Sequence, residues 1–408
     1  MPDPAKVRYL DRTTPPHLST LILLAGVSAL GMNIFLPSLP GMTAYFETDY
    51  AIMQLSVALY LGFNAALQLV IGPISDRVGR RPVVLGGIVL FMLATVGTLL
   101  ARSVEVFLAF RMAQAAIVVG MVLSRAIVRD LVTQDRAASM LGYLTMGMSV
   151  VPMIGPAIGG GLDDAFGWQA NFWLLLLMGG LLFALAWADL GETAPLTQSS
   201  FRDQVRDYPA LLTSPRFWGY NLAAAFSSGA FFAYLGGAPY VGAEVFGMGP
   251  SELGIYFGAP AIGYFAGNWI SGRYSVRFGI NNMILWGSLL CSGGMLVLLA
   301  TFAAGLEGAV IFFAFMTFVG LGNGMVIPNA TSGMLSVRPK LAGTASGLGG
   351  SMMLGGGAAL SALAGAALGD GATAFPLIYI MCATSAAGVL AILFVRYRDA
   401  QLAAAPAE

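Results

Sequence analysis

Long apolar segments separated by short polar ones dominate the pattern of the chain. Each is close to or longer than the roughly 20 residues that a helix needs to cross about 30 Å of hydrocarbon. Because backbone groups in lipid must be hydrogen-bonded within the protein, such segments are expected to be helices. The pattern predicts an all-α multi-pass membrane protein. Its twelve spans lie at 18–40, 50–72, 82–101, 104–128, 137–162, 168–188, 217–240, 251–272, 281–303, 308–328, 341–368 and 372–395.

The basic residues predict how these helices are oriented. With the amino terminus in the cytoplasm, 17 of the 20 Lys and Arg residues fall in cytoplasmic segments. Cytoplasmic loops of membrane proteins carry this kind of excess. One missed or extra helix would scramble the bias, so it also supports the number of spans. Both termini are therefore expected on the cytoplasmic side.

A long polar segment divides the predicted helices into two sets of six. The expected organisation is a cytoplasmic tail (1–17), a six-helix bundle (18–188), a cytoplasmic linker (189–214), a second six-helix bundle (215–396) and a short cytoplasmic tail (397–408).

A short internal echo indicates that the two bundles are repeats of each other. "GPISDRVG" at 72–79 and "GRYSVRFG" at 272–279 share four positions, and each segment follows the second span of its half. Two parallel, pseudo-symmetric repeats of six helices are typical of transporters, in which the substrate binds between the repeats near the middle of the membrane.

Composition and charge narrow the possible functions. The chain is 57% hydrophobic, against about 45–50% in soluble domains, and its formal net charge is zero, so no nucleic-acid partner is indicated. Cys291 and Cys382 lie in apolar segments, and the single histidine, His17, lies in the amino-terminal tail. Because these residues offer neither a metal site nor a nucleophile with its base, we expect no enzyme activity and no cofactor.

Several motifs resemble those of the major facilitator superfamily, and more narrowly those of its Bcr/CflA drug-resistance transporters. The superfamily resemblance rests on "GPISDRVGRRP" at 72–82, "FRMAQ" at 110–114 and "GPAIGG" at 155–160. The narrower one rests on "NIFLPSLP" at 33–40, "RAIVRDL" at 125–131, "VIPNATSGML" at 326–335 and "AGTASGLGG" at 342–350.

This resemblance implies a twelve-helix, proton-coupled drug antiporter of the bacterial inner membrane. Such a protein works by alternating access, and it is expected to act as a monomer on a small-molecule substrate. A transporter of a native metabolite, either an exporter or an importer, is the alternative.

The charged turn at 72–82 is predicted to form a cytoplasmic latch. A topology anchor would explain its arginines but not its acid. The resemblance implies that Asp76 helps to hold the two halves together, because the positive end of the helix dipole of the eleventh span starts nearby. Asp130 could hold Arg80 in the same cluster, and glycines permit close approach and a tight turn. The predicted latch residues are Gly72, Asp76, Arg77, Gly79, Arg80 and Asp130.

The fifth span is rich in glycine and proline, and the eleventh span echoes it with "GLGGSMMLGGG". Small residues let helices in lipid approach closely. Ordinary helix packing explains part of this pattern. The resemblance further implies that these helices help to gate the interface between the two halves. The gating residues predicted here are Gly155, Pro156 and Gly159.

Polar residues within the spans predict the substrate path. Arg111, Gln114 and Arg125 lie on one helical stripe of the fourth span, and a charge inside a membrane marks a functional candidate. Asn33 lies at similar depth, so it is expected to share a cavity with Arg111. Arg125 lies nearer the cytoplasm. It could extend its charged end to the membrane surface, join the latch, or contact the substrate. Packing or helix-to-helix hydrogen bonds are the alternative for the aromatic residues and asparagines. The predicted substrate-binding residues are Asn33, Tyr60, Asn64, Arg111, Gln114, Asn221, Phe226, Tyr234, Tyr264, Asn268, Asn323 and Asn329.

No acidic residue lies deep in a predicted span, since every Asp and Glu falls in a loop, a tail or the edge of a span. Many relatives carry an aspartate where this chain has Asn33. Proton coupling is therefore implied by the resemblance alone. The candidate carriers are Asp76, Asp130, Glu47, Asp49 and Glu105. With Arg111 and no acid at that depth, the site is expected to prefer neutral or anionic amphiphiles, of the phenicol or bicyclomycin kind.

Overall fold

The computed structural model describes residues 8–131, 140, 144, 151, 154–193, 209, 211–338, 341–368 and 373–404. Every regular element within these residues is a helix, a 3-10 turn or a π turn. This agrees with the all-α prediction.

The helix bounds follow the predicted spans, with extensions and breaks. The amino-terminal half contains α1 (Leu18–Asn33), η1 (Leu36–Ser38), α2 (Leu39–Tyr45), α3 (Tyr50–Val78), α4 (Arg80–Leu100), α5 (Val104–Gln114), η2 (Ala115–Ile117), α6 (Val118–Leu131), a helical segment at 154–166, and α8 (Gln169–Asp189). The carboxyl-terminal half contains α10 (Pro215–Tyr240), η3 (Val241–Val245), α11 (Pro250–Tyr256), α12 (Ala259–Phe278), α13 (Ile280–Ala303), α14 (Ala309–Val337), α15 (Ala342–Ala367) and α16 (Phe375–Ala404).

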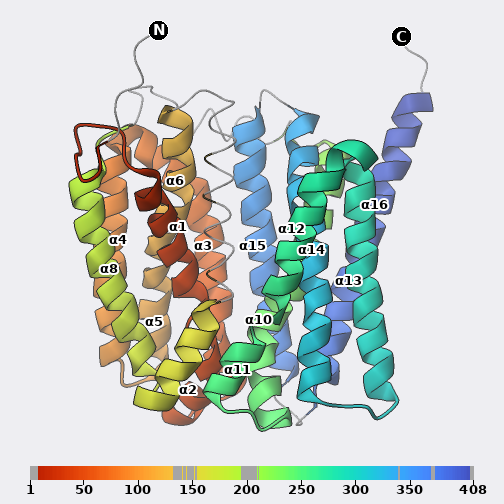
Figure 1. The fold of residues 1–408 in the computed structure, drawn as a ribbon, viewed down its shortest axis with the longest axis horizontal. Helices are drawn as coiled ribbons and strands as arrows, with labels where there is room; N and C mark the ends of the chain where they lie inside the picture. Colours follow the sequence, from red (N-terminus) through yellow and green to blue (C-terminus); the bar gives the residue numbers. More distant parts are fainter. Residues whose placement is uncertain are drawn as a thin grey trace.

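The helices form two groups that lie side by side (Figure 1). Helices α1 to α8 form one group and α10 to α16 the other, with α3 and α15 packed together where the groups meet. Both chain termini lie at one end of the molecule, and α2 and α11 lie at the opposite end. We call the end that carries α2 and α11 the closed end.

Nine helices among the described residues are long and apolar enough to cross a membrane. Helices α10 and α12 occupy the predicted seventh and eighth spans but are not among the nine. Both carry polar side chains that hydrogen-bond inside the carboxyl-terminal bundle, such as Ser227 and Ser271. The predicted fifth span, 137–162, lies partly outside the described residues.

Two of the predicted spans are broken, and others are extended. The first span ends as a helix at Asn33 because Pro37, in η1, cannot donate a backbone hydrogen bond, and the chain continues through η1 into α2. The fourth span is interrupted by η2. Helix α3 runs on to Val78 and α16 to Ala404, beyond the predicted bounds, because polar residues continue a helix that hydropathy alone would end.

The internal repeat is visible in the backbone. Gly79 and Gly279 separate the second and third helices of each half, with φ angles of 103° and 83°. Each glycine donates its N–H to a serine carbonyl one turn earlier, Ser75 at 3.0 Å and Ser275 at 2.8 Å. Only glycine adopts a positive φ of this kind easily. The similar sequences at 72–79 and 272–279 therefore form the same turn in both halves.

The segment before α1 is bound to the end of α8. The buried carboxylate of Asp189 accepts hydrogen bonds from the backbone N–H groups of Leu10 (2.8 Å) and His17 (2.9 Å) and from Thr20 Oγ1 (2.6 Å). The sequence assigned Asp189 to the polar linker, whereas the structure uses it to anchor the amino-terminal tail against α8.

Candidate functional site

A buried guanidinium joins three helices of the amino-terminal bundle. Arg111 on α5 is only 1% exposed. It donates to the backbone carbonyls of Gly31 on α1 (2.8 Å) and Ser56 on α3 (3.3 Å), and to Gln114 Oε1 (2.8 Å). Gln114 in turn donates a hydrogen bond from Nε2 to Thr95 Oγ1 of α4 at 2.8 Å. The arginine therefore acts as a polar junction inside the bundle.

Two aromatic rings cover this guanidinium. Its central carbon lies 4.1 Å from the ring centroid of Tyr60 and 4.3 Å from that of Phe35. Cation–π contacts and charge-assisted hydrogen bonds together compensate the charge for the loss of water. The sequence analysis placed Arg111 and Gln114 on one stripe of the fourth span and named Tyr60 separately as a candidate on the second span. It missed Phe35, and it did not predict the enclosure of the guanidinium by aromatic rings.

Two buried polar atoms on helices that Arg111 joins, α1 and α3, have unused hydrogen-bonding capacity within the described residues. The Oδ1 atom of Asn33 and the hydroxyl of Tyr60 are buried and have no hydrogen-bond partner among the residues that the structure describes. The amide nitrogen of Asn33 bonds only back to the carbonyl of Ala29 on its own helix, at 3.2 Å. Leaving such atoms buried and unpaired costs about 1–3 kcal/mol each. They are the groups of this cluster that a ligand or water could satisfy.

The next polar pair lies further along α3. Gln68 Nε2 donates to Asn64 Oδ1 at 3.0 Å. Ser351 of α15 donates to the carbonyl of Ala65 at 2.8 Å, one residue after Asn64. This part of α3 therefore faces the other bundle, and Asn64 lies next to the junction between the halves.

In the carboxyl-terminal bundle, Asn221 and Phe226 line one groove between α10 and α15, with a volume of about 430 Å³. Asn221 donates to the sulfur of Met352 at 3.0 Å, and its buried Oδ1 has no hydrogen-bond partner in the described part of the chain. A buried amide with free acceptor capacity beside an aromatic side chain can bind a polar amphiphile.

The remaining predicted residues make hydrogen bonds inside the carboxyl-terminal bundle. Tyr234 is fully buried and donates to the carbonyl of Phe257 at 3.3 Å. Asn323 accepts from Ser227 at 2.7 Å, and Asn329 donates to Ser271 at 2.8 Å. Asn268 donates to the carbonyl of Tyr264 at 2.8 Å, and both of these side chains are half-buried. The structure thus does not gather all twelve predicted residues around one cavity.

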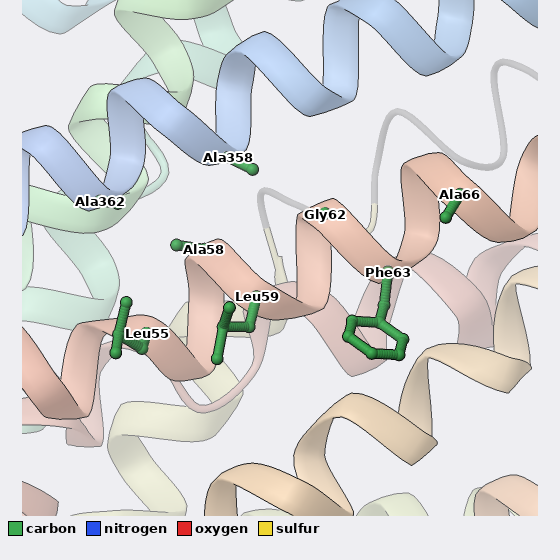
Figure 2. A pocket seen from close by; sticks show the side chains of 8 residues that line it. All are labelled: Leu55, Ala58, Leu59, Gly62, Phe63, Ala66, Ala358 and Ala362. Carbon is green, nitrogen blue, oxygen red and sulfur yellow. The ribbon is translucent and has the colours of Figure 1, made fainter.

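A second groove runs between α3 and α15 and has a volume of about 450 Å³. Figure 2 shows Ala58 of α3 and Ala358 of α15 on its facing walls, with Leu59 and Phe63 further along α3. Its lining is apolar. The sequence analysis missed it, although small residues at steps of four on α3 (Ala58, Gly62 and Ala66) and on α15 (Ala358 and Ala362) were a usable signal.

The predicted latch forms a charged cluster at the end that carries the termini. Arg80 is 6% exposed, bonds Asp76 at 2.6 Å and bonds Asp130 of α6 at 3.1 Å. It also donates to the hydroxyl of Ser75. The predicted contact between Arg80 and Asp130 is therefore confirmed. It ties α3, α4 and α6 together.

Two other predicted latch residues are placed differently. Arg77 is exposed. A Cβ added at Gly72 would meet no described atom within 4 Å. The expectation that Gly72 permits a close approach is wrong for the described residues, whereas Gly79 is required by its positive φ.

A carboxylate that the sequence analysis did not single out completes this cluster. Glu192 accepts from the backbone N–H of Arg80 at 2.8 Å and of Arg81 at 3.3 Å. These are the first N–H groups of α4, which have no partner inside the helix. The carboxylate therefore caps the helix, and its negative charge interacts favourably with the positive end of the helix dipole. The start of the linker thereby fixes the position of the latch turn.

At the closed end, glycines bring the two bundles into backbone contact. A Cβ on Gly160, in the helical segment 154–166, would overlap the carbonyl of Pro250 at the start of α11. A Cβ on Gly254 would overlap the carbonyl of Pro156. Asp164 accepts from the backbone N–H of Ser251 at 3.0 Å. The predicted gate position of the fifth span is thus next to the start of the eighth span.

The other predicted gate glycines of the fifth span pack within the amino-terminal bundle. A Cβ on Gly159 would overlap the carbonyl of Ile34, and one on Gly155 would lie 3.2 Å from Leu30.

Further bonds join the bundles at the same end. The hydroxyl of Tyr50 on α3 donates to the carbonyl of Gly236 on α10 at 2.8 Å. Gln54 Nε2 donates to the hydroxyl of Ser361 on α15 at 2.7 Å. Both contacts are buried, so the two halves are sealed together there.

Comparison with known proteins identifies the family. A family model described as the Major Facilitator Superfamily matches residues 21–362. The chain belongs to the Major Facilitator Superfamily. It is therefore a multi-pass membrane transporter of small molecules and not an enzyme.

Relatives of this superfamily member include proteins named for drug resistance in bacteria. It is 32% identical to Multidrug resistance protein D of Escherichia coli over 85% of this chain and 88% of that one. It is 32% identical to the Chloramphenicol resistance protein of Pseudomonas aeruginosa over 83% and 80%, and 28% identical to the Bicyclomycin resistance protein homolog of Haemophilus influenzae over 95% and 98%. The resemblance to Bcr/CflA-type transporters is confirmed.

The fold has counterparts among solved transporters. A bacterial homologue of the human lysosomal transporter Spinster, in an inward-facing and occupied conformation, superposes with a TM-score of 0.71 and 18% identity, covering 94% of this chain and 96% of that one. At this identity the likeness concerns the fold alone, and it agrees with the predicted two-bundle, twelve-helix architecture.

Proposed function

We propose that this transporter exports neutral or anionic amphiphiles from the bacterial cytoplasm in exchange for protons. The observation that carries the proposal is its similarity, over most of its length, to relatives named for multidrug, chloramphenicol and bicyclomycin resistance. These names favour a drug exporter over a transporter of a native metabolite. Phenicols and bicyclomycin-like compounds are the proposed substrates.

Export proceeds by alternating access between the two bundles. The excess of Lys and Arg supports an orientation in the bacterial inner membrane with the first and last helices' terminal ends in the cytoplasm. In this orientation the closed end faces outward. The contacts of Gly160 and Gly254 across the halves then form the outer gate, and the cluster of Asp76, Arg80 and Asp130 belongs to the inner gate. Because one chain supplies both bundles, a monomer is sufficient.

The substrate path runs between the unpaired polar atoms of the two halves. Asn33 and Tyr60 supply them in the amino-terminal bundle, and Asn221 supplies one beside Phe226 in the other bundle. Because no acid lies at this depth, a cation would lose its water without gaining a counter-charge, which is costly in a low-dielectric site. Neutral and anionic compounds avoid this cost.

Uptake into proteoliposomes tests the proposal. With the cytoplasmic face outward and an acidic lumen, chloramphenicol should accumulate in the lumen, and ethidium, a quaternary cation, should enter several-fold more slowly. Ethidium uptake that matches or exceeds chloramphenicol uptake would refute the proposed charge preference. No uptake of chloramphenicol or bicyclomycin above that of protein-free liposomes would refute drug export.

A further inference from the structure

The turn between α12 and α13 differs in charge from its counterpart between α3 and α4. In the first half, Arg80 pairs with Asp76 and Asp130, and a third acid caps α4. In the second half, Val276 stands at the position that corresponds to Asp76, and it is 98% exposed. The second turn therefore repeats the backbone of the first without its acid.

Two arginines close to this turn have no acid as a partner. Arg273 and Arg277 are both exposed, and neither forms an ion pair with an acid among the described residues. The carboxylate of Asp399, which reaches the start of α13, is already used. One of its oxygens bonds Arg216 at 2.9 Å, and the other accepts from Asn281 at 2.8 Å. The turn thus carries two positive charges that no described acid compensates.

Four aromatic rings form a continuous row beside these arginines. Ring centroids lie 6.4 Å apart for Trp269 and Tyr274, and 6.0 Å apart for Tyr274 and Phe278. Phe278 also contacts Trp286 of α13 at 5.2 Å, and the guanidinium of Arg277 lies 5.3 Å from the centroid of the Phe278 ring. All of these rings except that of Tyr274 are exposed. Apolar rings and a positive charge are therefore presented on one surface.

The second arginine belongs to the same surface. Trp269, Arg273 and Arg277 follow one another at steps of four residues, so they are neighbours on one face of α12. Both guanidinium groups can therefore reach a ligand that lies against the rings.

This surface lies where the helices approach the edge of the bilayer. Helix α12 begins beside α11 at the closed end and ends at the end that carries the termini (Figure 1), and α13 is long and apolar enough to cross a membrane. Trp269 precedes Gly279 by ten residues and Trp286 follows it by seven, or roughly 15 Å and 10 Å at helical rise. Tryptophan and tyrosine concentrate at the level of the lipid headgroups, where basic residues attract anionic lipids.

We propose that this surface binds the phosphate group of an anionic phospholipid. It consists of Trp269, Arg273, Tyr274, Arg277, Phe278 and Trp286, and we call it the lipid site. The two guanidinium groups donate to the phosphate oxygens, and the acyl chains lie along the exposed rings. A free phosphate would use the charges alone, whereas a phospholipid contacts both parts of the surface. The lipid supplies to the second turn the negative charge that the first half takes from its own acids.

Two lipids that differ only in the headgroup test the lipid site. Native mass spectrometry of the purified full-length protein in detergent measures the affinity for phosphatidylglycerol, which is anionic, and for phosphatidylcholine with the same acyl chains. The wild type should prefer phosphatidylglycerol at least tenfold, because each arginine contributes about fivefold. Arg273→Gln and Arg277→Gln should each weaken phosphatidylglycerol binding about fivefold and phosphatidylcholine binding less than twofold. Arg277→Lys should keep most of the preference.

Arg396→Gln is the matched control, because Arg396 is an exposed arginine of α16 at the same end of the molecule and lies outside the row of rings. It should keep the wild-type preference, and its melting temperature in lipid-free detergent should match that of Arg273→Gln and Arg277→Gln. An excess of inorganic phosphate should not displace phosphatidylglycerol. Equal affinity of the wild type for both lipids, or an equal loss in Arg396→Gln, would overturn the lipid site. Displacement by inorganic phosphate would also overturn it, because it would identify a site for a free anion.

Discussion

The backbone contact at the closed end predicts a conformational effect of a single methyl group. In Gly160→Ala the new Cβ would overlap the carbonyl oxygen of Pro250. A carbon approaches a carbonyl oxygen no closer than about 3.3 Å, so the two backbones would have to separate by roughly 1 Å. Neither group is the flexible end of a side chain that could rotate away. The closed arrangement of the bundles must therefore carry the strain.

The size of the effect follows from where the strain falls. Overpacking a tight contact costs about 1–3 kcal/mol. In alternating access, the outward-open state separates these backbones and feels none of this cost. The equilibrium between the two states should then shift about 5- to 150-fold toward the outward-open state. Transport should fall because the outer gate no longer closes readily, while the fold of each bundle is unaffected.

Gly161 provides a matched control one residue away. A Cβ there would lie 3.9 Å from the hydroxyl of Ser251, an ordinary van der Waals contact. Ala44 of α2 and Glu252 of α11 are both exposed. Spin labels on cysteines introduced at these two positions report the separation of the bundles by pulsed electron–electron double resonance. Gly160→Ala should add a longer-distance population, and Gly161→Ala should match the parent protein. Identical distance distributions in the two variants would refute the reasoning.

Three further predictions follow from the buried arginine, the latch and the topology. Arg111→Met should lower the free energy of unfolding by about 1–3 kcal/mol, because Gln114 Oε1 loses its buried donor. The melting temperature should fall in this variant but not in Arg102→Gln, which changes an exposed loop arginine; an unchanged melting temperature in Arg111→Met would contradict its role as a junction. Asp76→Asn should stay folded and bind chloramphenicol but turn over slowly, and normal turnover would remove the latch. A cysteine at Ala400 should react with impermeant maleimide only from the cytoplasm and one at Glu244 only from outside; reversed labelling would overturn the orientation.

Local pattern and chain-wide periodicity account for the parts that the sequence predicted well. Helix positions followed from apolar length, and the shared turn at Gly79 and Gly279 followed from a glycine requirement that is local to the backbone. The pairing of Arg80 with Asp130 was predictable because the two residues lie at the same end of consecutive predicted spans and carry opposite charges.

Contacts between distant segments account for what the sequence missed. A helical stripe indicates which face carries Arg111, but not that Phe35, from the turn after α1, covers it. The capping of α4 by Glu192 and the anchoring of the tail by Asp189 depend on where the linker and tail approach the helices. The bond between Gln54 and Ser361 likewise requires the packing of two bundles, which no local pattern encodes.

Proton-driven uptake of chloramphenicol is the most direct test of the account as a whole. Proteoliposomes with the cytoplasmic face outward are given an acidic lumen, so that protons leaving the lumen can drive the drug inward. Chloramphenicol should accumulate above its external concentration, a protonophore should abolish the accumulation, and the Asp76→Asn variant should accumulate the drug much more slowly. Uptake that only equilibrates chloramphenicol and is indifferent to the pH gradient would contradict proton-coupled export.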